Sequence, residues 1–124
     1  MTVKEFQFTV RDKTLSAKVT VANTPEPDGQ NVLVIYAPGA GSNINDPFGA
    51  FLNDRLAEEG ISVVRFQFPY MEAGTRRPDS PALLEETWRE IIALSRDLAL
   101  KSCGRQVLIG GRSLEGRTAP RVLA

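Results

Sequence analysis

A serine stands two residues after a glycine near the end of the sequence. Residues 106–110 read QVLIG, an apolar run typical of a buried strand, and GRSLEG follows from Gly111 to Gly116. This spacing allows a strand to turn sharply into a helix and to present the serine hydroxyl at the turn. The pattern therefore predicts that Ser113 is a nucleophile, although Glu115 stands two residues later, where a small residue is expected.

The histidine that would activate Ser113 is absent from these residues. The 124 residues include no histidine, and only eleven of them follow Ser113. A serine hydroxyl without a base is almost wholly protonated and is a weak nucleophile. Asp46, Glu72 and Glu115 are the carboxylates that could substitute, but an exposed carboxylate with an ordinary pKa of ~4.3 is a weak base for a hydroxyl.

A glycine-containing loop, PGAGSN at residues 38–43, follows the apolar run VLVIY. Gly39, Ala40 and Gly41 have small side chains or none, so their backbone N–H groups can approach an anion or a developing oxyanion. No Lys-Ser/Thr pair follows as in a phosphate loop, and Ile44 replaces the third glycine of a dinucleotide fingerprint. We expect an oxyanion loop without cofactor or metal; a structural turn and a nucleotide-binding half-domain are the alternatives.

Arginines are the candidates for an anion site. Arg76 and Arg77 lie in the loop PYMEAGTRRPD at residues 69–79, and Arg112 lies beside the serine. Guanidinium groups bind carboxylates and phosphates through paired hydrogen bonds. The alternative is that these are solvated loop arginines, the usual state of this residue at a protein surface.

The composition is that of an ordinary globular protein. The chain is 42% hydrophobic and 24% charged, and its 15 basic and 15 acidic residues cancel, so no net field favours nucleic acid or an anionic membrane. Cys103 is the only cysteine, which excludes an internal disulfide and fits a reducing cytoplasm. Without a signal-peptide pattern or a run of ~20 apolar residues, we expect a cytoplasmic protein that binds neither nucleic acid nor membranes.

The order of elements favours an α/β fold in one domain, residues 1–124. Strands are predicted at 5–10, 15–21, 32–36, 61–68 and 106–110, and helices at 47–60 and from 81 to before Gly104. The first two strands alternate apolar and polar residues, as in an antiparallel hairpin. The rest alternate with helices, which predicts a mainly parallel sheet covered on both faces, with its working loops beyond the carboxyl ends of the strands.

Both predicted helices carry an apolar stripe. In the first, Phe48, Phe51, Leu52 and Leu56 recur at three- and four-residue spacing, so we expect this stripe to pack on the sheet. In the second, Trp88 belongs to the same kind of stripe, and we expect it in the core rather than in a ligand site.

The segments PGAGSN, FPYMEAGTRRPD and GGRS, in this order, make the chain resemble α/β-hydrolases of the dienelactone-hydrolase-like branch. Within that branch it is most similar to a small group that includes testis-expressed and NSL-complex-subunit-like proteins. The resemblance runs from about residue 31 to Ser113, and FPYMEAGTRRPD is its most specific segment. It implies an α/β-hydrolase-like three-layer fold, with an N-terminal hairpin followed by a parallel β-α-β-α-β unit, and an ester or lactone as substrate.

The resemblance also implies roles for individual residues. Ser113 would be the nucleophile on its elbow, and the N–H groups of Leu114 and Ala40 would form the oxyanion hole. Gly39, Gly41 and Gly111 would shape the surrounding loops.

Several parts of such a hydrolase are not among the 124 residues. In this fold the triad acid and histidine follow the nucleophile along the chain, so both are expected beyond Ala124, together with the C-terminal strands. We therefore expect an incomplete serine hydrolase domain that is weakly active or inactive by itself. The strand ending at Ile109 would expose an edge and favour self-association. The absence of histidine supports the alternative of a non-catalytic protein-interaction module that retains the hydrolase fold.

Overall fold

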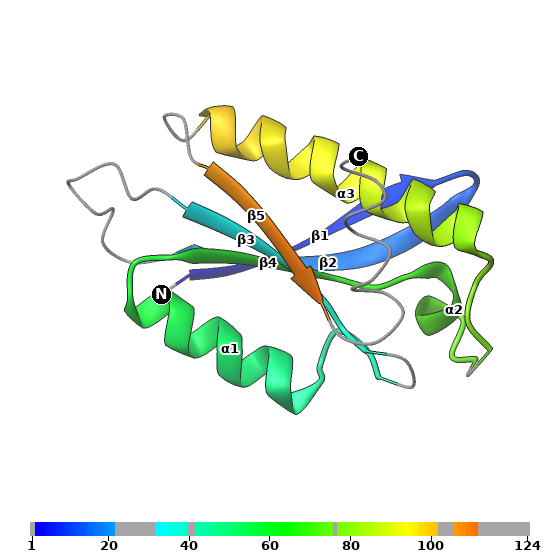
Figure 1. Ribbon diagram of the computed structural model, residues 1–124, viewed down its shortest axis with the longest axis horizontal. Helices are drawn as coiled ribbons and strands as arrows, with labels where there is room; N and C mark the ends of the chain where they lie inside the picture. The colour runs from blue at the N-terminus through cyan, green and yellow to red at the C-terminus, as the bar shows by residue number, and fades with distance from the viewer. Residues whose placement is uncertain (1, 22–31, 40–41, 76, 102–105, 112–124) are drawn as a thin grey trace.

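A computed structural model describes residues 2–21, 32–39, 42–75, 77–101 and 106–111. In these residues the elements follow in the order β1 (Thr2–Val10), β2 (Lys13–Val21), β3 (Val32–Ala37), α1 (Pro47–Glu58), β4 (Ser62–Phe66), α2 (Pro69–Glu72), α3 (Pro81–Lys101) and β5 (Gln106–Gly111), as Figure 1 shows. The predicted alternation of strands and helices is confirmed.

The strands form one mixed sheet in the order β1-β2-β4-β3-β5. β1 pairs antiparallel with β2, and β2 pairs antiparallel with β4, so the N-terminal hairpin is joined to the rest of the sheet. β3 lies between β4 and β5 and is parallel to both, with Ile35 opposite Val64 on one side and Ile109 on the other. The predicted parallel unit is therefore confirmed.

Helices cover both faces of the sheet and give three layers (Figure 1). α1 connects β3 to β4 and packs on one face, against β4 and β2. α3 precedes β5 and packs on the opposite face, against β1, β3 and β5. In the described part of the chain, neither helix combines the length and the apolar character needed to cross a bilayer.

The main hydrophobic core lies between α3 and the sheet. Trp88 of α3 is fully buried, and its ring lies 5.1 Å from the Phe66 ring and 6.3 Å from the Phe68 ring, both at steep interplanar angles. Edge-to-face packing of this kind adds to the stabilisation from burial. The same core includes Phe8, Val10, Leu15, Ala17, Leu33, Ile35, Ala37, Val64, Leu84, Ile91 and Ile92. The predicted core position of Trp88 is confirmed.

α1 begins at the predicted residues. Asp46 is its N-cap and Pro47 its first residue, and the Asp46 carboxylate accepts hydrogen bonds from the N–H groups of Phe48 (3.1 Å) and Gly49 (3.0 Å). These bonds satisfy donors that have no partner within the helix. Gly49 lies in a tight place, because an added Cβ would stand 2.7 Å from an Asp46 carboxylate oxygen and 2.8 Å from the Tyr36 ring.

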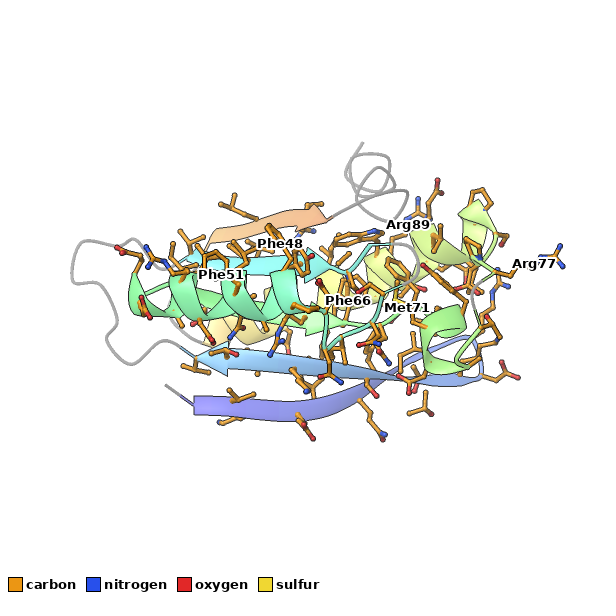
Figure 2. The ribbon with its side chains drawn as sticks, turned by 90° about the horizontal axis from the view of Figure 1, so that it is seen from below. Phe48, Phe51, Phe66, Met71, Arg77 and Arg89 are labelled. Carbon is orange, nitrogen blue, oxygen red and sulfur yellow. The ribbon has the colours of Figure 1, made fainter. Side chains whose placement is uncertain are left out.

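The predicted packing face of α1 is wrong for its two phenylalanines, whereas Leu52 and Leu56 of the predicted stripe are partly buried. Its buried residues are Gly49, Asn53 and Ala57, whereas Phe48 and Phe51 are 46% and 63% exposed. The small residues recur every four positions and let the helix backbone come close to the sheet, as Gly49 shows. The phenylalanines are therefore displaced to the flank of the helix (Figure 2).

The segment after β4 also differs from the prediction. The strand predicted at 61–68 is shorter, and part of the loop predicted at 69–79 forms the helical turn α2. Pro69 is the first residue of α2, and the N–H groups of Met71 and Glu72 donate to the Phe68 carbonyl at 3.0 and 3.1 Å. Proline fits the first helical position because its φ is already helical and its missing N–H is not needed there. A single turn is too short to give a periodic signal in the sequence.

Candidate functional site

The carboxyl ends of β3 and β5 lie side by side. The two strands are parallel neighbours, and their last pairs are Tyr36 with Gly110 and Ala37 with Gly111. Neighbouring strands are separated by ~4.8 Å, so the segments that follow Ala37 and Gly111 leave the sheet at adjacent points of one edge. In open α/β sheets this edge is where ligands bind.

Two of the predicted site residues are described at this edge. Gly39 lies two residues beyond β3 and is partly buried, and Gly111 is the last residue of β5. Ala40, Gly41, Arg76, Arg112, Ser113, Leu114 and Glu115 lie outside the described residues, so their predicted roles stay predictions.

The segment between β3 and α1, residues 38–45, is called here the β3 loop. The Ser42 N–H donates to the Gly39 carbonyl at 3.1 Å, and the Asp46 N–H donates to the Asn43 carbonyl at 3.0 Å. Asn43 also accepts from the Asn45 N–H through its side chain, at 2.8 Å. The described part of the loop is therefore folded back on itself by short-range hydrogen bonds.

Buried side chains of β4 and of the residue after it anchor the β3 loop to the sheet. The Ile44 N–H donates to Gln67 Oε1 at 3.0 Å, and Arg65 Nη1 donates to the Ile44 carbonyl at 3.4 Å. All three residues are buried. Burial lowers the pKa of the Arg65 guanidinium, against the raising effect of nearby carboxylates. The backbone of Ile44 is thus fixed through both its donor and its acceptor.

Glu72 extends this anchoring to the N-terminal hairpin. Its Oε1 accepts from Gln67 Nε2 at 3.0 Å and from the Ser16 N–H at 2.7 Å. Partial burial by itself raises the pKa of Glu72, but the hydrogen bonds from Ser16 and Gln67 outweigh it and hold the pKa below its ordinary value. Glu72 is therefore a structural acceptor with a lowered pKa, which is the opposite of what a general base requires.

The Asp46 carboxylate is also engaged in hydrogen bonds within the fold. Besides the two N–H groups at the start of α1, its carboxylate accepts from the Tyr36 hydroxyl at 3.0 Å, and the residue is buried. These three donors give the Asp46 carboxylate a structural role at the start of α1. Of the carboxylates that could replace the missing histidine, both that the structure describes are thus engaged in holding the fold.

Arg77 lines a shallow pocket of about 350 Å³ beside α2, together with Lys13, Tyr70, Thr75 and Asp79. Its side chain is exposed and projects outward (Figure 2). Asp79 accepts from the Tyr70 N–H at 3.1 Å; partial burial raises its pKa, opposed by that hydrogen bond and by the charge of Lys13. The pocket combines two cations with one carboxylate, so its charge suits a small anion.

A larger pocket of about 590 Å³ lies over the hairpin and the β3 loop, away from the ends of β3 and β5. Its polar lining residues are Glu5, Gln7, Ser16, Lys18 and Asn45, and Lys18 Nζ donates to Asn45 Oδ1 at 2.9 Å. Within the described ranges, no three acidic or cysteine side chains gather as a metal site would require.

Sequence reasoning missed Arg65 and Gln67 as supports of the site. Both lie in ISVVRFQF, two residues apart, so in an extended chain they share one face. In a strand that is expected to be buried on both faces, polar side chains are expected to be hydrogen-bonded. The alternation of Arg65 and Gln67 with apolar residues is therefore the feature of the sequence from which their supporting role could have been predicted.

The comparisons with known proteins agree with this geometry. Residues 30–124 match a family model described as alpha/beta hydrolase domain. An alpha-beta serine hydrolase homologue from Coxiella burnetii is similar over 98% of this chain and 57% of its own, with a TM-score of 0.72 and 21% identity. A dienelactone hydrolase from Anabaena variabilis is similar over 95% of this chain and 55% of its own, with a TM-score of 0.70 and 17% identity.

A serine hydrolase without a lid from Xanthomonas campestris gives similar values: 94% of this chain, 53% of its own, a TM-score of 0.68 and 20% identity. No curated protein sequence matches. At these identities the structures show a shared fold, and the chain spans about half the length of each of them.

Proposed function

Because the chain belongs to the alpha/beta hydrolase domain family, we propose that it carries the nucleophile and the oxyanion hole of an ester- or lactone-cleaving serine hydrolase. Ser113 is the nucleophile in this proposal, and the backbone N–H groups of Ala40 and Leu114 are the donors. The observation that carries it is the parallel pairing of β3 with β5, with Ala37 opposite Gly111.

That pairing limits how far apart the groups can lie. Ser113 is two residues beyond Gly111, and Ala40 is three residues beyond Ala37. A residue spans at most ~3.6 Å of chain, so both groups stay within a short reach of the same two strand ends. An oxyanion donor must lie about 3 Å from the developing charge, and tethers this short favour such an approach.

The anchoring of the β3 loop supports the same proposal. Preorganised donors stabilise an oxyanion because they need no reorganisation as charge develops. Gln67 and Arg65 hold the backbone of Ile44 at one end of the loop, and Ala37 is fixed in β3 at the other. The residues between them have two fixed ends.

We infer that the general base comes from outside residues 1–124. The chain has no histidine, and the Asp46 and Glu72 carboxylates are engaged elsewhere. In this fold the acid and the histidine follow the serine along the chain, and we propose that the complete enzyme supplies them in that order. Without them, an oxyanion hole and substrate binding leave a rate of ~10³ to 10⁴ over water, as in triad-deleted proteases.

Fluorophosphonate labelling tests the proposal. Trypsin cleaves after Arg112 and Arg117, so Ser113 begins the five-residue peptide SLEGR and its adduct is read separately from every other serine. We expect slow formation of one adduct on this peptide. It is lost in Ser113→Ala and kept in Ser42→Ala, a serine of the β3 loop that serves as the matched control. An unlabelled SLEGR peptide after exhaustive incubation contradicts the proposal.

The absence of histidine favours a second candidate, a protein-interaction module that keeps the fold without the chemistry. The labelling experiment separates the two, because an inert module has no reason to place a reactive hydroxyl at the turn after β5. A label at Ser113 refutes the module. An inert Ser113 together with a well-folded chain supports it.

A further inference from the structure

Three side chains on one face of the sheet hold the end of the β3 loop. Lys18 of β2 is directly opposite Arg65 of β4, so both side chains point to the same face, and Gln67 follows Arg65 by two residues on that face. Arg65 Nη1 donates to the Ile44 carbonyl at 3.4 Å, and Gln67 Oε1 accepts from the Ile44 N–H at 3.0 Å. Lys18 Nζ donates to Asn45 Oδ1 at 2.9 Å. Two successive loop residues are therefore held from two neighbouring strands.

The two opposed cations, Lys18 and Arg65, are stabilised by acceptors of the β3 loop. Like charges directly opposite each other destabilise a strand pair, and water screens these two only in part, because Arg65 is buried and the Lys18 side chain is 23% exposed. The Glu5 carboxylate lies 3.8 Å from Lys18 Nζ, but its side chain is 77% exposed, and a loose surface ion pair of this kind contributes little. The hydrogen bond to Asn45 is therefore the stronger of these two contacts at the ammonium group.

The contact with Lys18 continues into the β3 loop through Asn45. The Asn45 N–H donates to Asn43 Oδ1 at 2.8 Å, and the Asp46 N–H donates to the Asn43 carbonyl at 3.0 Å. Asn43 is three residues beyond Ala40 in the chain. Because a residue spans at most ~3.6 Å, Asn43 fixes the end of a short tether to Ala40.

This support comes from the N-terminal hairpin, β1 and β2, which precedes the residues 30–124 that match the family model. Besides Lys18, the hairpin also holds Gln67, because the Gln67 N–H donates to the Ser16 carbonyl at 3.1 Å. The Ser16 N–H in turn donates at 2.7 Å to Glu72, which accepts from the Gln67 amide. The hairpin thus reaches the β3 loop by two routes, directly through Lys18 and indirectly through Gln67. The direct route depends on one side chain, so a single substitution can remove it without changing the strand pairing.

We propose that Lys18 is a positioning residue for the oxyanion donor of the β3 loop. The proposal rests on the proposed function, in which the Ala40 N–H is that donor. Lys18 acts through Asn45 rather than on the substrate, since its ammonium group holds the end of the loop in place before negative charge develops. Donors that are already fixed stabilise an oxyanion better than donors that must reorganise.

The rate of fluorophosphonate labelling of the whole chain, read on the peptide SLEGR, tests the proposal. Lys18→Met is expected to lower the maximal labelling rate about tenfold and to leave the half-saturating concentration unchanged, because a displaced donor loses part of the ~10²- to 10³-fold effect of a removed one. Asn45→Ala should lose as much, and the double variant no more, since both remove one contact. Asn45→Asp keeps an acceptor oxygen in place and should recover most of the rate that Asn45→Ala loses. Lys4→Met is the matched control, because Lys4 is an exposed lysine of the same hairpin; it should label at the wild-type rate.

Amide hydrogen exchange measured by NMR tests the positioning without the chemistry. The Asn45 and Asp46 N–H groups are expected to exchange about tenfold faster in Lys18→Met and at the wild-type rate in Lys4→Met, while Trp88 fluorescence checks that each variant is folded. Unchanged exchange in Lys18→Met, an unchanged labelling rate, additive losses in the double variant, or an equal loss in Lys4→Met each overturns the proposal. A wild-type chain that is never labelled refutes the nucleophile instead, and exchange alone then decides whether Lys18 positions the loop.

Discussion

Gln67 is expected to be a main support of the β3 loop. Its side chain is buried and makes two hydrogen bonds, one accepted from the Ile44 N–H and one donated to Glu72, both at 3.0 Å. Gln67→Leu keeps the approximate size and removes both bonds. It also leaves the buried Ile44 N–H with no acceptor at this position, since the Gln67 oxygen is the one that serves it.

The expected loss of stability follows from these contacts. The lost bond to Glu72 contributes about 1 kcal/mol net, and the buried Ile44 N–H left without a partner costs about 1 to 3 kcal/mol. Burial of the new leucine side chain offsets part of this, by about 1 kcal/mol. The free energy of unfolding should therefore fall by about 1 to 3 kcal/mol, a large share of the ~5 to 15 kcal/mol typical of a domain.

Urea unfolding followed by Trp88 fluorescence measures this loss. At a slope of ~1 to 3 kcal/mol per molar urea, the midpoint should drop by about 1 M. Gln7→Leu is the control, because Gln7 is an exposed β1 residue and its replacement should change stability by less than ~0.5 kcal/mol. If Gln67→Leu changes stability no more than the control does, the loop is not held through Gln67 and the reasoning is wrong.

The same variant has a pH signature. The Glu72 pKa is lowered on folding, so its contribution to stability is present above the unfolded pKa and is lost as pH falls through the folded one. Gln67→Leu removes one of the bonds that lower it, while the bond from the Ser16 N–H stays. An NMR titration should therefore show a higher Glu72 pKa in the variant. An unchanged pKa would contradict the contact.

Three further predictions follow from other parts of the fold. Gly49→Ala should lower the free energy of unfolding by about 1 to 2 kcal/mol, because strain against the Asp46 carboxylate exceeds the ~1 kcal/mol gain in helix propensity. Thermal unfolding measures this loss. Gly110→Ala is the control and should have a small effect, because the space beside Gly110 is open. Trp88→Ala should cost about 3 to 5 kcal/mol in urea unfolding followed by circular dichroism, and a loss below 1 kcal/mol would remove Trp88 from the core. Inorganic phosphate should shift the Arg77 side-chain NMR resonances if its pocket takes an anion, and resonances that stay in place reject the anion site.

Much of the fold was predictable because its signals are local. The Asp46-Pro47 and Ser80-Pro81 pairs mark helix starts, and both helices begin at these prolines; the Leu83 N–H donates to Ser80 Oγ at 3.3 Å. The hairpin and the parallel strands were visible as alternating and continuous apolar runs. Capping, proline geometry and strand periodicity depend on neighbouring residues, so a single sequence contains them.

The packing of α1 was not predictable in the same way. Spacing alone favoured the phenylalanine stripe, yet Gly49, Asn53 and Ala57 face the sheet. Which stripe is buried depends on how near the helix axis comes to the strands, and that distance is set by the opposing side chains of β3 and β4. Hydrophobicity along the chain does not include this distance.

By itself the sequence determined the order of the elements, the parallel arrangement of the last three strands, the core position of Trp88 and the lack of a histidine base. Only the tertiary structure decided that Gln67 and Glu72 anchor the β3 loop, that the Asp46 carboxylate accepts from the Tyr36 hydroxyl, and that Phe48 and Phe51 are exposed. The reason is that strand, helix and cap signals act between residues close in the chain. Hydrogen bonds across 10, 23 or 56 residues exist only once the sheet has brought the segments together.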